Sequence, residues 1–232
     1  MATKANMSAT DHIAKTGVTV LTESAILDFY AHDIYERGAD LLAVVRPQNK
    51  QELAAAVAAA TEQNIAVIPR GGGMSYTGGY TSRQPDAVLF DLAGMDRILE
   101  INEIDMTVTV EAGCTWANLY EALQAKGLRT PFWGTLSGLK ASIGGGMSQN
   151  GVFWGSGRYG TAVQSCLAME VVLADGTILD TGASFTRPYG PDLTGLFLAD
   201  TGALGMKATI TLRLIPEAQA HGYASFSFES YQ

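Results

Sequence analysis

Glycine gathers in two clusters along this chain, and these clusters constrain the fold more than any other feature of the sequence. The chain has 26 glycines among 232 residues, a share above the roughly 7% usual in proteins. Gly71, Gly72 and Gly73 open the first cluster, and the second is dense from Gly144 to Gly160. Because glycine has no side chain, such clusters predict backbone that turns sharply or lies close to another group.

Composition and charge exclude several classes of protein. Fifteen lysines and arginines stand against 23 aspartates and glutamates, which gives a net charge of −8 and a pI near 4.8. This balance leaves no broad basic surface, so no nucleic-acid or anionic-lipid partner is expected. Hydrophobic residues make up 47% of the chain, which is enough for the core of one large domain or two small lobes.

Cysteine and histidine are too few for several kinds of site. Cys114 and Cys166 cannot form a disulfide framework or a four-thiolate metal site. His12, His32 and His221 belong to no HExxH motif, so no metal site is expected. The first twenty residues lack the apolar region of a signal peptide, and no apolar run reaches the roughly 18 residues of a membrane helix. We therefore expect a soluble, cytoplasmic protein with no membrane span.

Hydrophobic patterning predicts an α+β fold. Asn49 and Glu52 form a capping box before the clearest helix of the chain, and Thr115 caps another. Asp175 and Gly176 lie at the turn of a predicted hairpin. Hairpins mixed with crossover helices favour α+β over a doubly wound parallel sheet. Besides the two capped helices, helices are expected at 22–30 and 192–199, and strands at 41–46, 65–69, 87–92, 97–104, 106–112, 168–174, 177–181, 208–215 and 223–229.

The first glycine cluster lies in the segment RGGGMSYTGG, residues 70–79, directly after a predicted strand. Consecutive glycines can present successive backbone N–H groups to one concavity that holds phosphate oxygens, and Ser75 and Thr77 would add hydroxyl donors. The segment is not a P-loop, because no Gly-Lys pair occurs in the chain. It is not a GxGxxG fingerprint either, since Tyr76 stands where the third glycine should. The alternative is a glycine-rich surface turn.

The second cluster lies in a long segment that is almost without charge. Between Gly134 and Gly151 it combines small hydroxyl side chains, amides and bare backbone, and Lys140 is its only charged residue. This chemistry suits a large, flat, hydrogen-bonding ligand such as a flavin ring better than acid–base catalysis. The alternative is a flexible loop, which the presence of two such segments in one chain disfavours.

Four segments, in order, resemble the landmarks of a known family. They are IPRGGGMSYTGG (68–79), GTLSGLKASIGGGMSQNG (134–151), RYGTAVQSCLAMEVVLADGTIL (158–179) and TGALGMKATITLRLIP (201–216). Together they resemble the vanillyl-alcohol oxidase/p-cresol methylhydroxylase (PCMH) family of flavin-dependent oxidoreductases, which includes D-lactate and glycolate dehydrogenases. The resemblance covers roughly residues 41–216. It implies a PCMH-type FAD-binding domain of two α+β lobes, with FAD stretched between them.

The resemblance also implies which residues bind FAD. The segment 70–76 would hold the pyrophosphate, and 134–151 would line the stretch from the pyrophosphate to the flavin. Gly205 and Met206 would lie near the adenosine end. The implied cofactor-binding residues are Pro69, Arg70, Gly71, Gly72, Gly73, Met74, Ser75, Tyr76, Gly79, Gly134, Thr135, Leu136, Ser137, Ser142, Ile143, Gly145, Gly146, Ser148, Gln149, Asn150, Gly151, Gly205 and Met206.

Two departures from the family pattern imply that FAD is bound non-covalently. Some members attach FAD through a histidine in the first glycine loop, where this chain has Met74. Others use a cysteine in the second loop, and neither Cys114 nor Cys166 falls there. Both cysteines are expected to be packed as small hydrophobic residues rather than to react.

Family members carry a cap domain after the FAD domain, which lines the substrate pocket and usually supplies the catalytic acid or base. This chain stops where the cap is expected to begin. We therefore expect a flexible arm at 1–20, the FAD domain at 21–216 and the first segment of a cap at 217–232, in a truncated chain or one subunit of a split enzyme. No catalytic residue is assigned. Tyr76, Trp154, Arg158 and Tyr159 are candidates for contact with FAD or substrate, and packing or surface roles are the alternative.

Three functions stay open. The first is oxidation of a small alcohol or 2-hydroxy acid by hydride transfer to FAD, a reaction whose chemistry the cofactor carries. The second is a flavin-carrying electron-transfer subunit that has no activity without a partner chain. The third is a nucleotide or sugar-phosphate binder that uses the same loops without FAD, and a colourless protein that takes up no flavin would support it.

Overall fold

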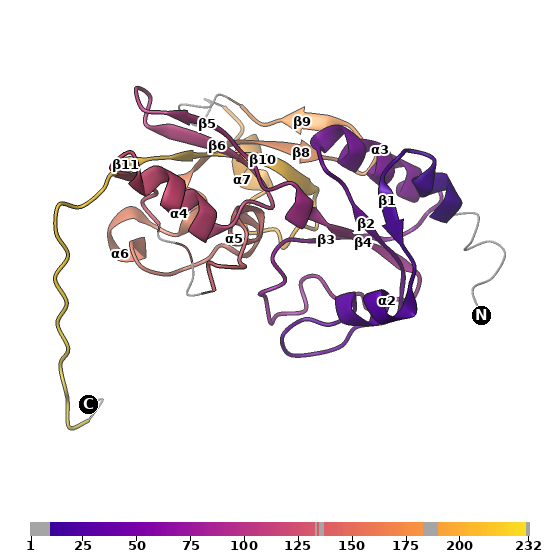
Figure 1. Ribbon diagram of the computed structural model, residues 1–232, viewed down its shortest axis with the longest axis horizontal. Coiled ribbons are helices and arrows are strands. Elements are labelled where there is room, and N and C mark those ends of the chain that lie inside the picture. Colours follow the sequence, from indigo (N-terminus) through magenta and orange to yellow (C-terminus); the bar gives the residue numbers. More distant parts are fainter. Residues whose placement is uncertain (1–9, 133, 135–136, 183–189, 231–232) are drawn as a thin grey trace.

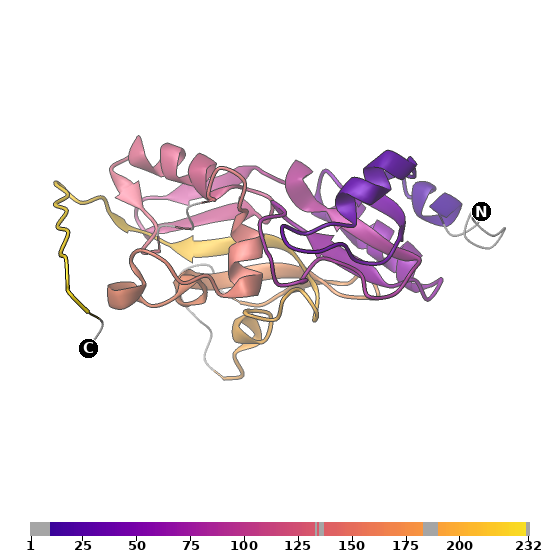
Figure 2. The same ribbon diagram turned by 90° about the horizontal axis from the view of Figure 1, so that it is seen from below.

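The computed structural model describes residues 10–132, 134, 137–182 and 190–230. These residues form two lobes that lie side by side along the long axis of the molecule, each built around its own sheet (Figures 1 and 2). Among them, no helix is long and apolar enough to cross a membrane.

The first lobe is built on a four-stranded sheet in the order β1-β2-β4-β3. Both β2 and β3 run parallel to the central strand β4, whose residues are all buried, while β1 pairs antiparallel with β2. The predicted cap at Asn49 is confirmed, because its side chain accepts a hydrogen bond from the Glu52 N–H. The elements are β1 (Thr19–Leu21), α2 (Ser24–Tyr30), β2 (Leu41–Arg46), α3 (Lys50–Thr61), β3 (Val67–Arg70) and β4 (Ala87–Asp91).

The second lobe is built on a five-stranded antiparallel sheet in the order β5-β6-β10-β8-β9. Thr115 caps α4, as predicted, by accepting a hydrogen bond from the Asn118 N–H. The lobe contains β5 (Ile98–Asn102), β6 (Thr107–Glu111), α4 (Trp116–Gln124), β7 (Leu128–Arg129), α5 (Ile143–Gln149), α6 (Ser156–Tyr159), β8 (Cys166–Val172), β9 (Ile178–Asp180), α7 (Leu193–Leu196), β10 (Met206–Arg213) and β11 (Ile215–Pro216), with short 3₁₀ helices at Leu92–Gly94 and Ala162–Ser165.

Helix α3 joins the two lobes. Its buried alanines and Leu53 share one apolar cluster with Val172, Met206 and Ala208 of the second sheet and with Phe90 of the first. Small side chains on α3 let both sheets approach the helix closely, because alanine adds little volume at a helix surface. The combination of a mostly parallel sheet and an antiparallel sheet confirms the predicted α+β class.

Two segments near the chain ends differ from expectation. Residues 10–14 form a helical turn in which Ile13 is fully buried, so the described part of the segment expected as a flexible arm is ordered. The strand predicted at 223–229 is not formed: the extended segment after Pro216 leaves the body of the molecule (Figure 1), and Tyr223, Phe226 and Phe228 are exposed. An alternating pattern forms a strand only where a sheet edge can pair with it. The boundaries proposed at 20 and 216 stay predictions.

The long segment predicted as a loop contains helices. Residues 143–149 form α5 although three of them are consecutive glycines, which are poor helix formers. Ser142 caps the helix by accepting a hydrogen bond from the Gly145 N–H, and Asn150 ends it in a left-handed conformation with φ of 50°. The caps and the packing of Ile143 and Met147 into the core therefore outweigh the low helix propensity of glycine.

Candidate cofactor site

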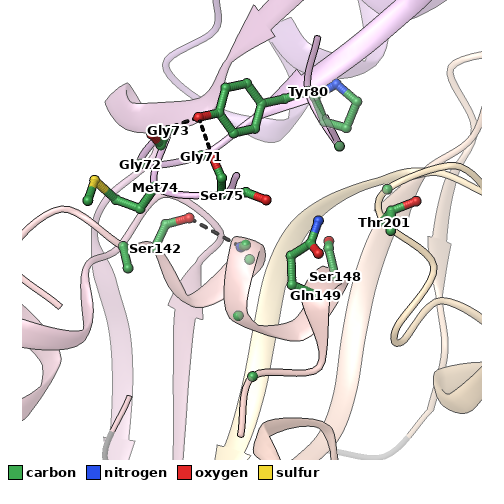
Figure 3. A pocket seen from close by; sticks show the side chains of 18 of the residues that line it. Gly71, Gly72, Gly73, Met74, Ser75, Tyr80, Ser142, Ser148, Gln149 and Thr201 are labelled. Carbon is green, nitrogen blue, oxygen red and sulfur yellow. Dashed lines mark hydrogen bonds between the residues drawn. The ribbon is translucent and has the colours of Figure 1, made fainter. Parts of the chain in front are cut away.

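A cavity of about 380 Å³ lies between the two lobes. The first glycine loop, residues 71–79, forms one wall, and α5 forms the opposite wall (Figure 3). The loop before β10 forms a third wall, which contains Thr201, Gly202 and Gly205. The two glycine clusters of the sequence thus meet across one cavity.

The first wall presents backbone N–H groups that have no internal partner. Within the described chain, the N–H groups of residues 72–76 donate no hydrogen bond. Gly73 has a φ of +65°, a left-handed conformation that glycine adopts without strain. The hydroxyls of Ser75 and Thr77 lie 2.9 Å apart. These unpartnered amides and hydroxyls are the donors that the predicted phosphate-binding nest would use.

The second wall brings bare helix backbone to the cavity. A Cβ atom at Gly144 would meet the Ala112 backbone and side chain, and one at Gly146 would meet the indole of Trp116. Glycine at both positions therefore lets α5 lie close against β6 and α4. At the end of the helix, Ser148 and Gln149 face the first glycine loop (Figure 3), and the Gln149 side chain accepts a 3.5 Å hydrogen bond from Thr77.

The third wall is held by a buried ion pair. The Lys207 ammonium donates a 2.6 Å hydrogen bond to Asp200, and only 2% and 3% of these two side chains are exposed. Asp200 also accepts hydrogen bonds from the Gly202 and Leu204 N–H groups, and the Thr201 N–H bonds to the Ser148 carbonyl of α5. The pair therefore fixes the loop from 199 to 205 against α5.

Charge is almost absent from the cavity. Among the described residues that line it, Lys207 is the only charged side chain, and no aspartate, glutamate or histidine lines it. Burial lowers the pKa of the Lys207 ammonium, while the hydrogen bond and the charge of Asp200 act in the opposite direction. The cavity thus offers many hydrogen bonds and one paired cation, an arrangement that suits a polar ligand carrying negative charge.

Most residues singled out in the sequence lie at this cavity. Those that line it are Pro69, Gly71, Gly72, Gly73, Met74, Ser75, Tyr76, Gly79, Ser137, Ser142, Gly145, Gly146, Ser148, Gln149, Asn150, Gly151 and Gly205. Four others do not. Ile143 and Met206 are buried in the core, Gly134 packs against the Trp116 ring, and Arg70 turns away into a group of aromatic rings. Thr135 and Leu136 lie outside the described residues.

Several residues that line the cavity were not among the implied cofactor-binding residues. Thr77 was expected as a hydroxyl donor beside Ser75, and it lines the cavity. The others fall into two groups: residues inside or next to the four recognised segments, and residues on other elements that the fold brings in. The first group is Tyr80, Ala141, Gly144, Val152, Thr201, Gly202 and Lys207, and the second is Leu92, Ala112 and Trp116. The position of the second group depends on tertiary packing alone.

Of the four further residues that the sequence offered for contact with FAD or substrate, one lines the cavity and three do not. Tyr76 lines the cavity and is largely exposed. Trp154 stacks on Phe153 and is exposed, and Arg158 stacks on the ring of Tyr159. Trp154, Arg158 and Tyr159 do not line this cavity, which favours packing or surface roles for these three residues.

Solved structures with the same fold define the class. p-Cresol methylhydroxylase with substrate bound aligns with a TM-score of 0.78 and 24% identity, over 94% of this chain and 45% of that one. A 4-ethylphenol oxidase from Gulosibacter chungangensis aligns with a TM-score of 0.75 and 23% identity, over 95% and 44% of the two chains. The protein has the two-lobed fold of PCMH-type flavoproteins, as predicted.

The sequence then places the chain in a family. A model of the FAD binding domain matches residues 41–182, more than half of the chain, so the chain belongs to the FAD binding domain family and its cofactor is FAD. Glycolate oxidase subunit GlcD of Bacillus subtilis is 32% identical over 76% of this chain, and a probable D-lactate dehydrogenase of Danio rerio is 35% identical over 79%. The chain spans 37% of the length of each of these relatives.

The residues present fit FAD. The Trp116 indole nitrogen and the Asn150 side-chain amide oxygen are buried at the cavity, and neither has a hydrogen-bond partner in the described structure. Buried polar atoms normally have partners, so these two atoms are available for a ligand. The free N–H groups of the first wall suit the pyrophosphate, whose charge would otherwise be buried without compensation.

Proposed function

We propose that this chain is the FAD-holding part of an oxidoreductase that acts on a 2-hydroxy acid. The observation that carries the proposal is the interlobe cavity, whose described lining residues offer free backbone N–H groups and include no acidic side chain. Bound FAD would supply the hydride acceptor, while the protein would position FAD and exclude water from the site. The relatives named for glycolate oxidase, D-lactate dehydrogenase and D-2-hydroxyglutarate dehydrogenase support the substrate class.

Each wall has its own role in this proposal. The N–H groups of residues 72–76 hold the pyrophosphate, and Ser75 adds a hydroxyl donor. Gln149 and Asn150 at the end of α5 provide amide groups for the polar edge of the flavin ring. Gly205 and the paired Lys207 border the adenosine end.

FAD is held without a covalent bond in this proposal. Met74 lines the cavity at the position where some family members have a linking histidine, and a thioether forms no such link. Cys114 and Cys166 are fully buried and do not line the cavity. Acid denaturation should release all the flavin into the supernatant, whereas flavin that stays with the precipitated chain would contradict this point.

A second candidate function is a flavin-carrying module without activity of its own. The observation that favours it is the lack of any aspartate, glutamate or histidine among the described residues that line the cavity. Proton removal from a substrate hydroxyl is most often carried out by such a group within hydrogen-bond reach. On this alternative, the base comes from a cap or from a partner subunit.

The test begins with flavin uptake. The purified protein is incubated with FAD and desalted, and its visible absorbance is recorded before and after denaturation. Flavin bands that survive desalting support the proposal, and a protein that stays colourless contradicts it. The loaded protein is then mixed anaerobically with D-lactate, glycolate or D-2-hydroxyglutarate. Bleaching of the flavin supports an autonomous enzyme, and stable colour with all three favours the module. Cytoplasmic location stays a prediction, since several relatives are described as mitochondrial.

A further inference from the structure

Tyr80 lies behind the first glycine loop and bonds to its backbone. Its hydroxyl lies 2.8 Å from the Gly73 carbonyl oxygen and 3.1 Å from the Ser75 carbonyl oxygen, so one proton is shared between two acceptors (Figure 3). Tyr80 is 6% exposed. Burial raises the pKa of the Tyr80 hydroxyl above its ordinary value, which keeps the proton in place at neutral pH.

The two hydrogen bonds determine where the loop N–H groups point. In a trans peptide the C=O and the following N–H point in opposite directions. Because the Gly73 and Ser75 carbonyls point to Tyr80, the N–H groups of Met74 and Tyr76 point away from it. These are two of the N–H groups that have no partner within the described chain, and both residues line the cavity.

A stack of side chains supports Tyr80 from behind. The Arg70 guanidinium lies 5.3 Å from the Tyr80 ring centre, 4.5 Å from that of Tyr30 and 5.5 Å from that of Phe29. Arg70 also fills the space where a side chain at Gly73 would lie. This cation–π stack holds the Tyr80 ring in place beside the loop.

We propose that Tyr80 is a positioning residue for FAD, which orients the N–H groups of Met74 and Tyr76 toward the pyrophosphate. The inference rests on the proposed function of the cavity. Tyr80 contacts the glycine loop through its hydroxyl, and its effect on FAD binding is transmitted through the loop backbone. Without that hydroxyl, the Gly73 carbonyl loses its partner and the Ser75 carbonyl keeps only a 3.4 Å hydrogen bond from the Ile34 N–H, so both peptides are held less firmly.

Tyr80→Phe tests this proposal, and Tyr30→Phe is its matched control. Tyr30 is also buried, and its hydroxyl donates a 2.6 Å hydrogen bond to Asp91 and accepts one from Arg46, but it does not bond to the glycine loop. Both variants remove one buried hydroxyl and keep the ring that stacks on Arg70. The dissociation constants of FAD and of ADP are measured by fluorescence titration and competition, together with the thermal midpoint of the FAD-free protein.

We expect Tyr80→Phe to weaken binding of FAD and of ADP about tenfold, the effect of losing roughly one hydrogen bond. Tyr30→Phe should lower the thermal midpoint as much or more, yet change both dissociation constants less than about twofold. Unchanged binding by Tyr80→Phe would overturn the inference alone. Equal losses of affinity in the two variants would also overturn it, since they would reflect stability only. A wild-type protein that binds no FAD would overturn the proposed function, and the inference with it.

Discussion

Gly72 lies directly against Lys140, so that a Cβ atom at Gly72 would overlap the Lys140 carbonyl oxygen. The two residues belong to the two glycine segments of the sequence and to different lobes. The missing side chain at Gly72 therefore sets how closely the lobes approach beside the cavity. Gly72 also lines the cavity, so this glycine leaves room for the other lobe at the place where the sequence predicts a ligand.

Gly72→Ala should separate the two glycine segments. The added methyl group meets backbone rather than a flexible side chain, so we expect a cost of about 1–3 kcal/mol in folding stability. FAD affinity should fall by at least about tenfold, because both walls line the cavity in which FAD is proposed to bind. Gly157→Ala is the control, since nothing lies within 4 Å of a Cβ at that position. Wild-type FAD affinity in Gly72→Ala would show that the lobe spacing does not matter for binding.

Lys207→Met should destabilise the protein by about 3–5 kcal/mol, because it leaves the buried Asp200 carboxylate without its cation. In the double variant, Asp200→Asn added to Lys207→Met removes the unpaired charge and keeps a side-chain oxygen for the Gly202 N–H. The double variant should therefore recover part of the lost folding stability. Lys126→Met breaks an exposed pair with Glu103 and should cost about 0–1 kcal/mol. Urea denaturation measures all three, and equal stability of Lys207→Met and Lys126→Met would refute the prediction.

The folding stability should fall at acidic pH because of Glu111. Burial would raise the pKa of this carboxyl, but the hydrogen bonds from the Arg97 side chain and backbone outweigh it, so the pKa lies below its ordinary value of 4.5. The stabilisation is therefore complete above that value and disappears as the pH falls through the lowered pKa.

Glu111→Gln should cost about 1.5–3 kcal/mol at neutral pH, and the difference from wild type should shrink below the ordinary carboxyl range. Denaturation curves across the acid range measure this. Glu103→Gln, at an exposed pair, is the control. A difference that stays constant down to strongly acidic pH would contradict the assignment.

The two cysteines should be inert in the folded protein. Burial raises the pKa of the Cys114 thiol to about 12, so almost no thiolate is present at neutral pH. Cys166 is also fully buried. We expect a thiol reagent at mildly alkaline pH to label neither residue until denaturant is added. Rapid labelling of the native protein would show that the second-lobe core opens on the timescale of the reaction.

The local signals of the sequence predicted the strands and the capped helices well, because these depend on nearby residues. Asn49 and Thr115 cap helices where the pattern placed them. Helix α5 was missed, since three glycines hide a helix that Ser142 and core packing maintain. The strand expected near Phe226 failed because a strand needs a partner edge, which no pattern within the segment can reveal.

The site could be predicted only where it is continuous in the chain. The glycine motifs identified the first wall and α5. Arg70 was expected at the cofactor, but its side chain stacks on aromatic rings that come from α2 and from the end of the loop. Lys207 lines the cavity because β10 runs beneath it, and a single lysine in a strand carries no local sign of that position.

Residues of both lobes line the cavity, so a ligand that fills it contacts both lobes and holds them together. A ligand that binds the folded chain and not the unfolded one stabilises the folded state by mass action. A cell short of riboflavin would then hold less of this protein at an unchanged rate of synthesis. Chains without FAD would unfold more often and be degraded by proteases sooner. Vitamin supply would in this way set the abundance of the protein as well as its colour.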